Sequence, residues 1–168
     1  MQRFLIIAIA SLLVLGCPAG GWASGPPSAQ ALSQLPPALR AAVLTGHASA
    51  IERAIQTLSR GDSLLAANLA ASIVQVARQM LQTNPTAACV SAAVAVSTVR
   101  SRALWQNSPQ QSNLVLNGAA SIAQVVGHNL NLGSQSAKIQ LINATITLAQ
   151  AMNKPAVAAA VAAQIPYR

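Results

Sequence analysis

Two stretches of the chain, NLAASIVQVA at residues 68–77 and NGAASIAQVV at residues 117–126, are nearly identical and start 49 residues apart. Seven of their ten positions carry the same residue. The match continues at the same offset, to Leu81 with Leu130, Ala88 with Ala137 and Ala95 with Ala144. Self-similarity at a period of a few tens of residues is typical of helical arrays. We interpret it as the duplication of a helical hairpin, although no named repeat consensus is visible.

Each copy carries one line of polar residues on an otherwise apolar helix. These are Asn68, Ser72, Gln75 and Gln79 in the first copy, and Asn117, Ser121, Gln124 and His128 in the second. Spacings of three and four residues place each set on one narrow stripe of a helix. Because a helix that is apolar nearly all round is normally buried, we predict that these two helices form the central pair. Their stripes would either reach solvent or form a polar seam between them.

Prolines, glycines and small polar residues elsewhere mark helix ends. Asn84-Pro85 and Ser108-Pro109 each place a capping residue before a proline, and Asp62 can cap a third helix. The predicted helices cover about 37–45, 49–60, 63–82, 85–104, 109–130, 134–152 and a short segment from 155. No stretch sustains a period of two, so strands are not expected. The predicted fold is all-α, with six to seven short-looped antiparallel helices and an internally duplicated helical hairpin, as a bundle or a short α-superhelical array.

The first 23 residues have the features of a bacterial export signal: a positive charge at Arg3, an apolar run at 4–15, and small residues before Ser24. That run is well short of the about 20 residues that a membrane-spanning helix needs. Two processing hypotheses stay open, namely cleavage after Ala23 or a lipobox in which Cys17 is acylated. The folded part is therefore expected to be extracytoplasmic, periplasmic or secreted, with a possible lipid anchor at Cys17 as its only membrane attachment.

Three segments follow from this interpretation. They are a signal peptide at 1–23, a flexible Pro- and Ser-rich linker at 24–36 and a single all-helical domain at 37–168.

Reactive side chains are scarce. The chain has only two acids, Glu52 and Asp62, so paired carboxylates for acid–base catalysis could come from these alone. Cys89 lies in an apolar stretch that should bury it and raise its thiol pKa. The two histidines, His47 and His128, accompany no nucleophile motif and no metal-type spacing. We therefore predict no catalytic, cofactor or metal site, and a protein that is not an enzyme.

The basic residues form the one surplus without a structural explanation, because the formal net charge of the alanine-rich chain is +8. The candidate anion-binding residues are Arg53, Arg60, Arg100 and Arg102. The leading hypothesis is a non-catalytic interaction or structural module that binds another envelope or secreted protein. The alternative is a cationic binder of anionic envelope polymers or lipids, such as lipopolysaccharide, acidic polysaccharide or phospholipid headgroups. With so few aromatic residues, sequence-specific nucleic-acid binding is not expected.

Overall fold

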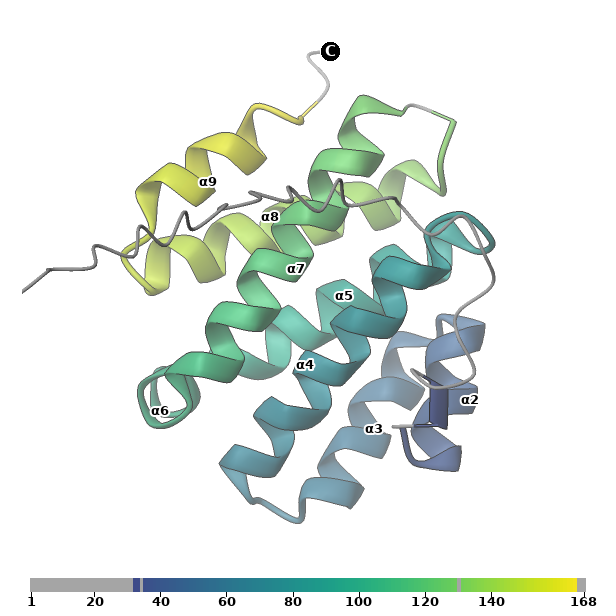
Figure 1. The fold of residues 1–168 in the computed structure, drawn as a ribbon, viewed down its shortest axis with the longest axis vertical. Coiled ribbons are helices and arrows are strands. Elements are labelled where there is room, and N and C mark those ends of the chain that lie inside the picture. The colour runs from purple at the N-terminus through teal and green to yellow at the C-terminus, as the bar shows by residue number, and fades with distance from the viewer. Residues whose placement is uncertain (1–31, 34, 130, 166–168) are drawn as a thin grey trace, which may run out of the picture.

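The computed structural model describes residues 32–33, 35–129 and 131–165, with the side chain of Arg102 excepted (Figure 1). The predicted signal peptide, Cys17 and most of the predicted linker lie outside these residues. Within the described part the protein has eight helices and no strand, which confirms the all-α prediction. The helices are α2 (Pro37–Thr45), α3 (Ala48–Ser59), α4 (Ser63–Met80), α5 (Pro85–Val99), α6 (Arg102–Asn107), α7 (Pro109–His128), α8 (Gln135–Ala151) and α9 (Pro155–Ala162).

Side-chain caps begin several of these helices where the sequence predicts them. The carboxylate of Asp62 accepts hydrogen bonds from the backbone N–H groups of Leu64, at 2.9 Å, and Leu65, at 3.1 Å. The Asn84 side chain accepts one from Ala87 N–H at 3.1 Å, with Pro85 as the first helical residue. These bonds satisfy N–H groups that have no partner within the helix.

The prediction that one helix continues from residue 85 to residue 104 is wrong, because α5 ends at Val99 and a separate short helix follows. The hydroxyl of Ser101 accepts a hydrogen bond from Leu104 N–H at 3.3 Å and so begins α6. A serine can occupy the interior of a helix or cap a new one, and here the cap is used. This additional helix raises the total above the predicted six to seven.

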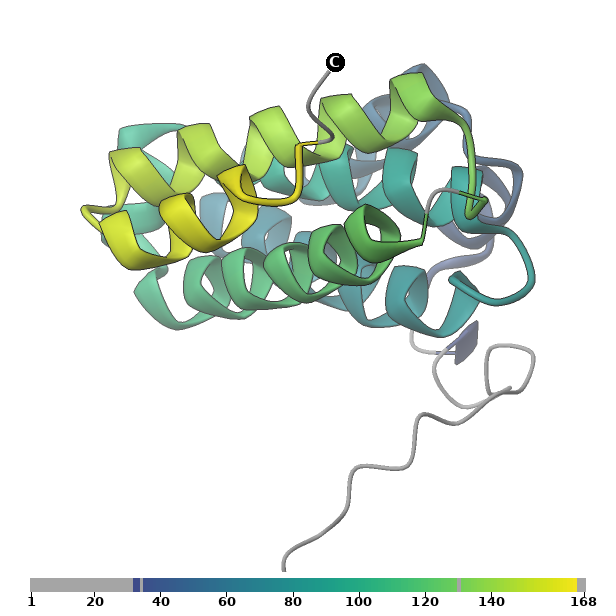
Figure 2. The same ribbon diagram turned by 90° about the horizontal axis from the view of Figure 1, so that it is seen from above.

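The two copies of the hairpin, α4–α5 and α7–α8, lie next to each other in the same orientation (Figure 1). α4 packs against its counterpart α7 in one layer, and α5 packs against α8 in the other (Figures 1 and 2). The pair α2–α3 covers one end of this arrangement, and α9 packs on α8 at the other. The duplication therefore produces a two-layered stack of helical hairpins.

The repeated decapeptides touch directly. A Cβ added at Gly118 of α7 would lie 3.6 Å from Val74 Cβ of α4 and would overlap its Cγ1 atom. Val74 is only 2% exposed, so the absence of a side chain at Gly118 lets the two helices approach.

The most enclosed helix, however, is α5 rather than α4 or α7. Nine of its 15 residues are buried, and it packs against α2, α3, α4, α7 and α8. The prediction that α4 and α7 form the central pair is therefore corrected. α5 has neither a charge nor an exposed polar stripe, and it can be covered on more sides than α4 or α7.

The packed structure also begins earlier than residue 37. Leu35, which the sequence analysis assigns to the linker, is 1% exposed and belongs to the core. The guanidinium of Arg40 donates a hydrogen bond to the Leu35 carbonyl at 3.1 Å, which holds this segment against α2.

Candidate functional site

The polar stripes of α4 and α7 face solvent, which decides between the two predicted alternatives. Asn68, Gln75, Asn117, Gln124 and His128 are exposed, whereas both serines and Gln79 are half-buried. We call this surface the polar face; it consists of Asn68, Ser72 and Gln75 on α4 and Asn117, Ser121 and Gln124 on α7. An exposed leucine precedes each stripe at matching positions, Leu65 at 40% exposure and Leu114 at 57%.

The two halves of the polar face are more alike than the core beneath them. At the offset of 49 residues, both leucines, both asparagines, both serines and both glutamines of this surface are identical. Several buried pairs differ in size, namely Ala66 with Val115, Ala67 with Leu116, Leu69 with Gly118, Val74 with Ala123 and Ala77 with Val126. The identity stops at the fourth position of each stripe, where Gln79 corresponds to His128, and it includes the buried pairs Ala70 with Ala119, Ala71 with Ala120 and Ile73 with Ile122. The polar face therefore matches at every position, whereas the core beneath it matches only in part.

A shallow groove of about 350 Å³ runs beside the second stripe, between α7 and α9. Its wall on α7 is formed by Asn117, Ala120, Ser121 and Gln124, and its wall on α9 by Ala156, Val157 and Ala160. None of these lining residues is charged or aromatic. The groove thus offers amide and hydroxyl groups along one side and small apolar side chains along the other.

A second open hollow, of about 300 Å³, lies between α3, α4 and α5. It is lined by Glu52, Ile55, Gln56, Ser59, Ala66, Val94, Ser97 and Thr98. Glu52 is the only titratable side chain among these residues. A single carboxylate cannot supply the separate acid and base that general acid–base catalysis uses.

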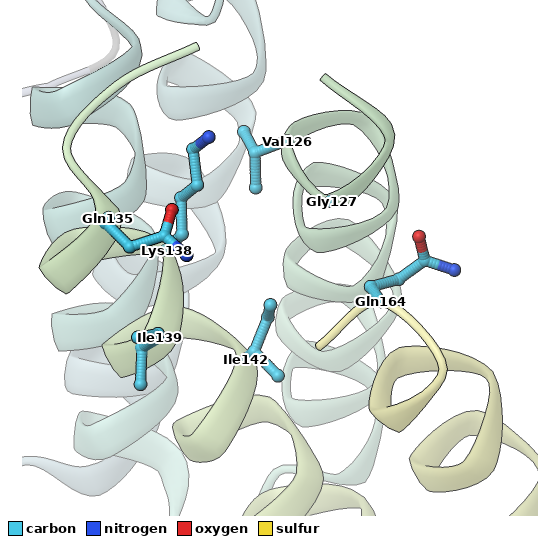
Figure 3. A pocket seen from close by; sticks show the side chains of 7 residues that line it. All are labelled: Val126, Gly127, Gln135, Lys138, Ile139, Ile142 and Gln164. Atoms are coloured by element: carbon cyan, nitrogen blue, oxygen red, sulfur yellow. The ribbon is translucent and has the colours of Figure 1, made fainter. Parts of the chain in front are cut away.

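Lys138, on α8, is a buried cation that the sequence analysis missed. Its side chain is 4% exposed and borders a cavity of about 10 Å³ between α7 and α8, together with Val126, Gly127, Gln135, Ile139, Ile142 and Gln164 (Figure 3). The ammonium Nζ donates a hydrogen bond to the carbonyl of Asn129, the residue that follows α7, at 3.1 Å. A cation at this position complements the negative end of the α7 dipole.

The repeat contains a signal for this burial. Lys138 occupies the position of Cys89 in the first copy, 49 residues earlier. Cys89 is itself fully buried, as predicted. Burial raises the pKa of its thiol to about 11, while the nearby positive charge of Lys138 acts in the opposite direction. Cys89 is therefore protonated, and a poor nucleophile, at neutral pH.

The acids and histidines in the described part of the chain do not assemble into a site. Asp62 caps α4, and Glu52 is exposed on α3. His47 precedes α3 without a side-chain cap, and His128 is exposed at the end of α7. Within residues 32–33, 35–129 and 131–165, no three His, Cys, Asp or Glu side chains lie close enough together to hold a metal ion.

The four candidate arginines are divided between two parts of the fold. Arg53 is exposed on α3, and its Nε donates to the Ser49 carbonyl at 3.3 Å. Arg60 follows α3 with a φ of 48°, so it has left the helix and does not share a helical face with Arg53. Gly61 also has a positive φ, so both residues form the turn. Arg100 and Arg102 flank the junction between α5 and α6.

No known protein family, curated protein or solved structure matches this chain. Among the described helices, none combines the length and the apolar character needed to cross a membrane.

Proposed function

We propose that the protein is a non-catalytic, extracytoplasmic module that binds another envelope or secreted protein through the polar face. The supporting observation is the identity of its exposed residues in both copies of the hairpin. Substitutions at exposed positions usually change the free energy of unfolding by less than about 0.5 kcal/mol, so folding alone does not require them to stay the same. A function of this surface gives them a reason to do so.

The composition of the polar face fits a protein partner. Asparagine and glutamine side chains both donate and accept hydrogen bonds, as does the peptide group. The exposed leucines, Leu65 and Leu114, add apolar area at the start of each stripe. Since the face carries no charge, recognition would depend on hydrogen bonds and shape and would depend little on salt concentration.

Site-specific photo-crosslinking in the organism of origin tests this proposal. A photoreactive phenylalanine analogue replaces Gln75 on α4 or Gln124 on α7, with the exposed Gln140 and Gln150 of α8 as matched controls. We expect both positions of the polar face to crosslink to the same protein and the α8 positions to give no such product. Crosslinks that form equally from α8, or none from either position of the face, would refute the proposal.

A further inference from the structure

We infer that the α7–α9 groove holds an extended, uncharged segment of the partner polypeptide, lying along the α7 axis. This inference rests on the proposed function and names the part of the partner that the second stripe contacts.

The groove exists because the array ends in a short helix. The neighbour of α4 is α7, a helix of 20 residues, and the two helices approach closely where Gly118 of α7 meets Val74 of α4. Beside α7 stands α9, which has only eight residues and packs mainly on α8. The chain after α9 meets α7 near its C-terminal end, where a Cβ added at Gly127 would lie 2.6 Å from Gln164 Cβ. Between this contact and Asn117 the two helices leave an open groove.

The α7 wall presents hydrogen-bonding groups at a spacing that suits an extended chain. Asn117, Ser121 and Gln124 follow one another on one face, and the first and last are seven residues apart along the helix. This span is about 10 Å at 1.5 Å per residue, the length of about three residues of a β-strand. Each carboxamide can donate to a peptide carbonyl and accept from a peptide N–H at the same time. An extended strand exposes such unpaired groups along its edges.

The opposite wall limits the side chains of the segment. Ala156, Val157 and Ala160 are small and apolar, so they suit small apolar side chains pointing toward α9. A charged side chain placed there would lose water without gaining an ionic partner from the lining residues. A sugar would find no aromatic surface among those residues on which to stack.

Selection from a random dodecapeptide phage-display library against the complete mature protein tests this inference. Two alanines of α9 provide a matched pair, because Ala159 and Ala160 are both exposed and only Ala160 lines the groove. The variant A160E places a carboxylate in the groove, and A159E places one outside it. Gln124→Ala on the groove wall is compared in the same way with Gln150→Ala on α8.

We expect the library to yield uncharged peptides rich in β-branched and small residues. Their binding should fall at least tenfold with A160E and with Q124A, and should stay within twofold of the wild type with A159E and Q150A. N-methylation of the central peptide groups should weaken binding, since it removes backbone donors. Circular dichroism of each variant establishes that it is folded.

Three results would overturn the inference: no enriched peptide, enrichment of charged peptides, or binding that A160E leaves unchanged. The proposed function would survive any of them if Gln75 and Gln124 still crosslink to a common partner. If those crosslinks are absent as well, the proposed function fails independently.

Discussion

The contact between Gly118 and Val74 allows a quantitative test of how the duplicated hairpins pack. In the variant G118A, the new methyl group would overlap Val74 Cγ1, and Val74 is too well buried to move into solvent. Overpacking of this kind costs about 1–3 kcal/mol. Replacing a mid-helix glycine by alanine also raises the free energy of unfolding by about 1 kcal/mol through helix propensity. The expected net loss in the free energy of unfolding is therefore about 1 kcal/mol.

Substitution of Val74 by alanine reverses the sign of the effect of G118A on stability. V74A removes two buried methyl groups, which costs about 2 kcal/mol at about 0.8 kcal/mol per group plus a cavity contribution. In the V74A background, the methyl group that G118A introduces enters the vacated space, so G118A should now stabilise the protein by about 1 kcal/mol through helix propensity. The resulting coupling energy is about 2 kcal/mol, with each residue's effect dependent on the other.

Urea denaturation of the four proteins, followed by circular dichroism at 222 nm, measures this cycle. The m-value should be the same for all four, because the surface exposed on unfolding hardly changes. If the two substitutions are additive within about 0.5 kcal/mol, Gly118 and Val74 do not touch, and the stacking of the two hairpins described above is incorrect.

Three further outcomes concern the core. Because the folded-state pKa of Cys89 is raised from 9.0 to about 11, the native protein retains a proton that the unfolded chain loses. The contribution of the protonated Cys89 thiol to the free energy of unfolding is complete below pH 9. Between pH 9 and 11 it declines by about 1.4 kcal/mol per pH unit. Urea titrations at pH 8 and 10.5 should therefore show a larger loss of stability with rising pH for wild type than for C89A. K138A should lower the free energy of unfolding by about 2–4 kcal/mol, because removing the buried lysine stem leaves a cavity. K138M keeps most of that volume and should lower it by less than about 1.5 kcal/mol. Equal shifts in melting temperature for the two variants would contradict a packing role of the stem. A119L should destabilise by about 1–3 kcal/mol and A120L by less, because Ala119 is fully buried while Ala120 borders the groove, an order that thermal melts would check.

The helix boundaries were largely predictable because local chemistry determines them. Asn84-Pro85 and Asp62 cap helices through bonds within a few residues along the chain, so the sequence contains the whole interaction. The cap at Ser101 is not determined locally in this way. The same residue suits a helix interior or a cap, and the choice depends on how α6 packs against α4 and α7.

The candidate site could be predicted only in part. The periodicity of Asn117, Ser121 and Gln124 revealed the stripe, but its exposure depends on which sides of α7 the neighbouring helices cover. The groove could not be predicted, since it requires the position of α9 relative to α7. The burial of Lys138 is harder to predict, because a lysine is rarely buried, although its match to Cys89 indicates an interior position.

The claim that both stripes bind one partner is tested most directly by placing a charge in each. Q75K on α4 and Q124K on α7 are compared, singly and together, with Q150K on α8, and the amount of partner that co-purifies with the protein from cells is measured. The account predicts that each single substitution lowers recovery at least fivefold, that the double substitution abolishes it, and that Q150K has no effect. Recovery that falls equally with Q150K, or stays unchanged with both stripes substituted, would contradict the account.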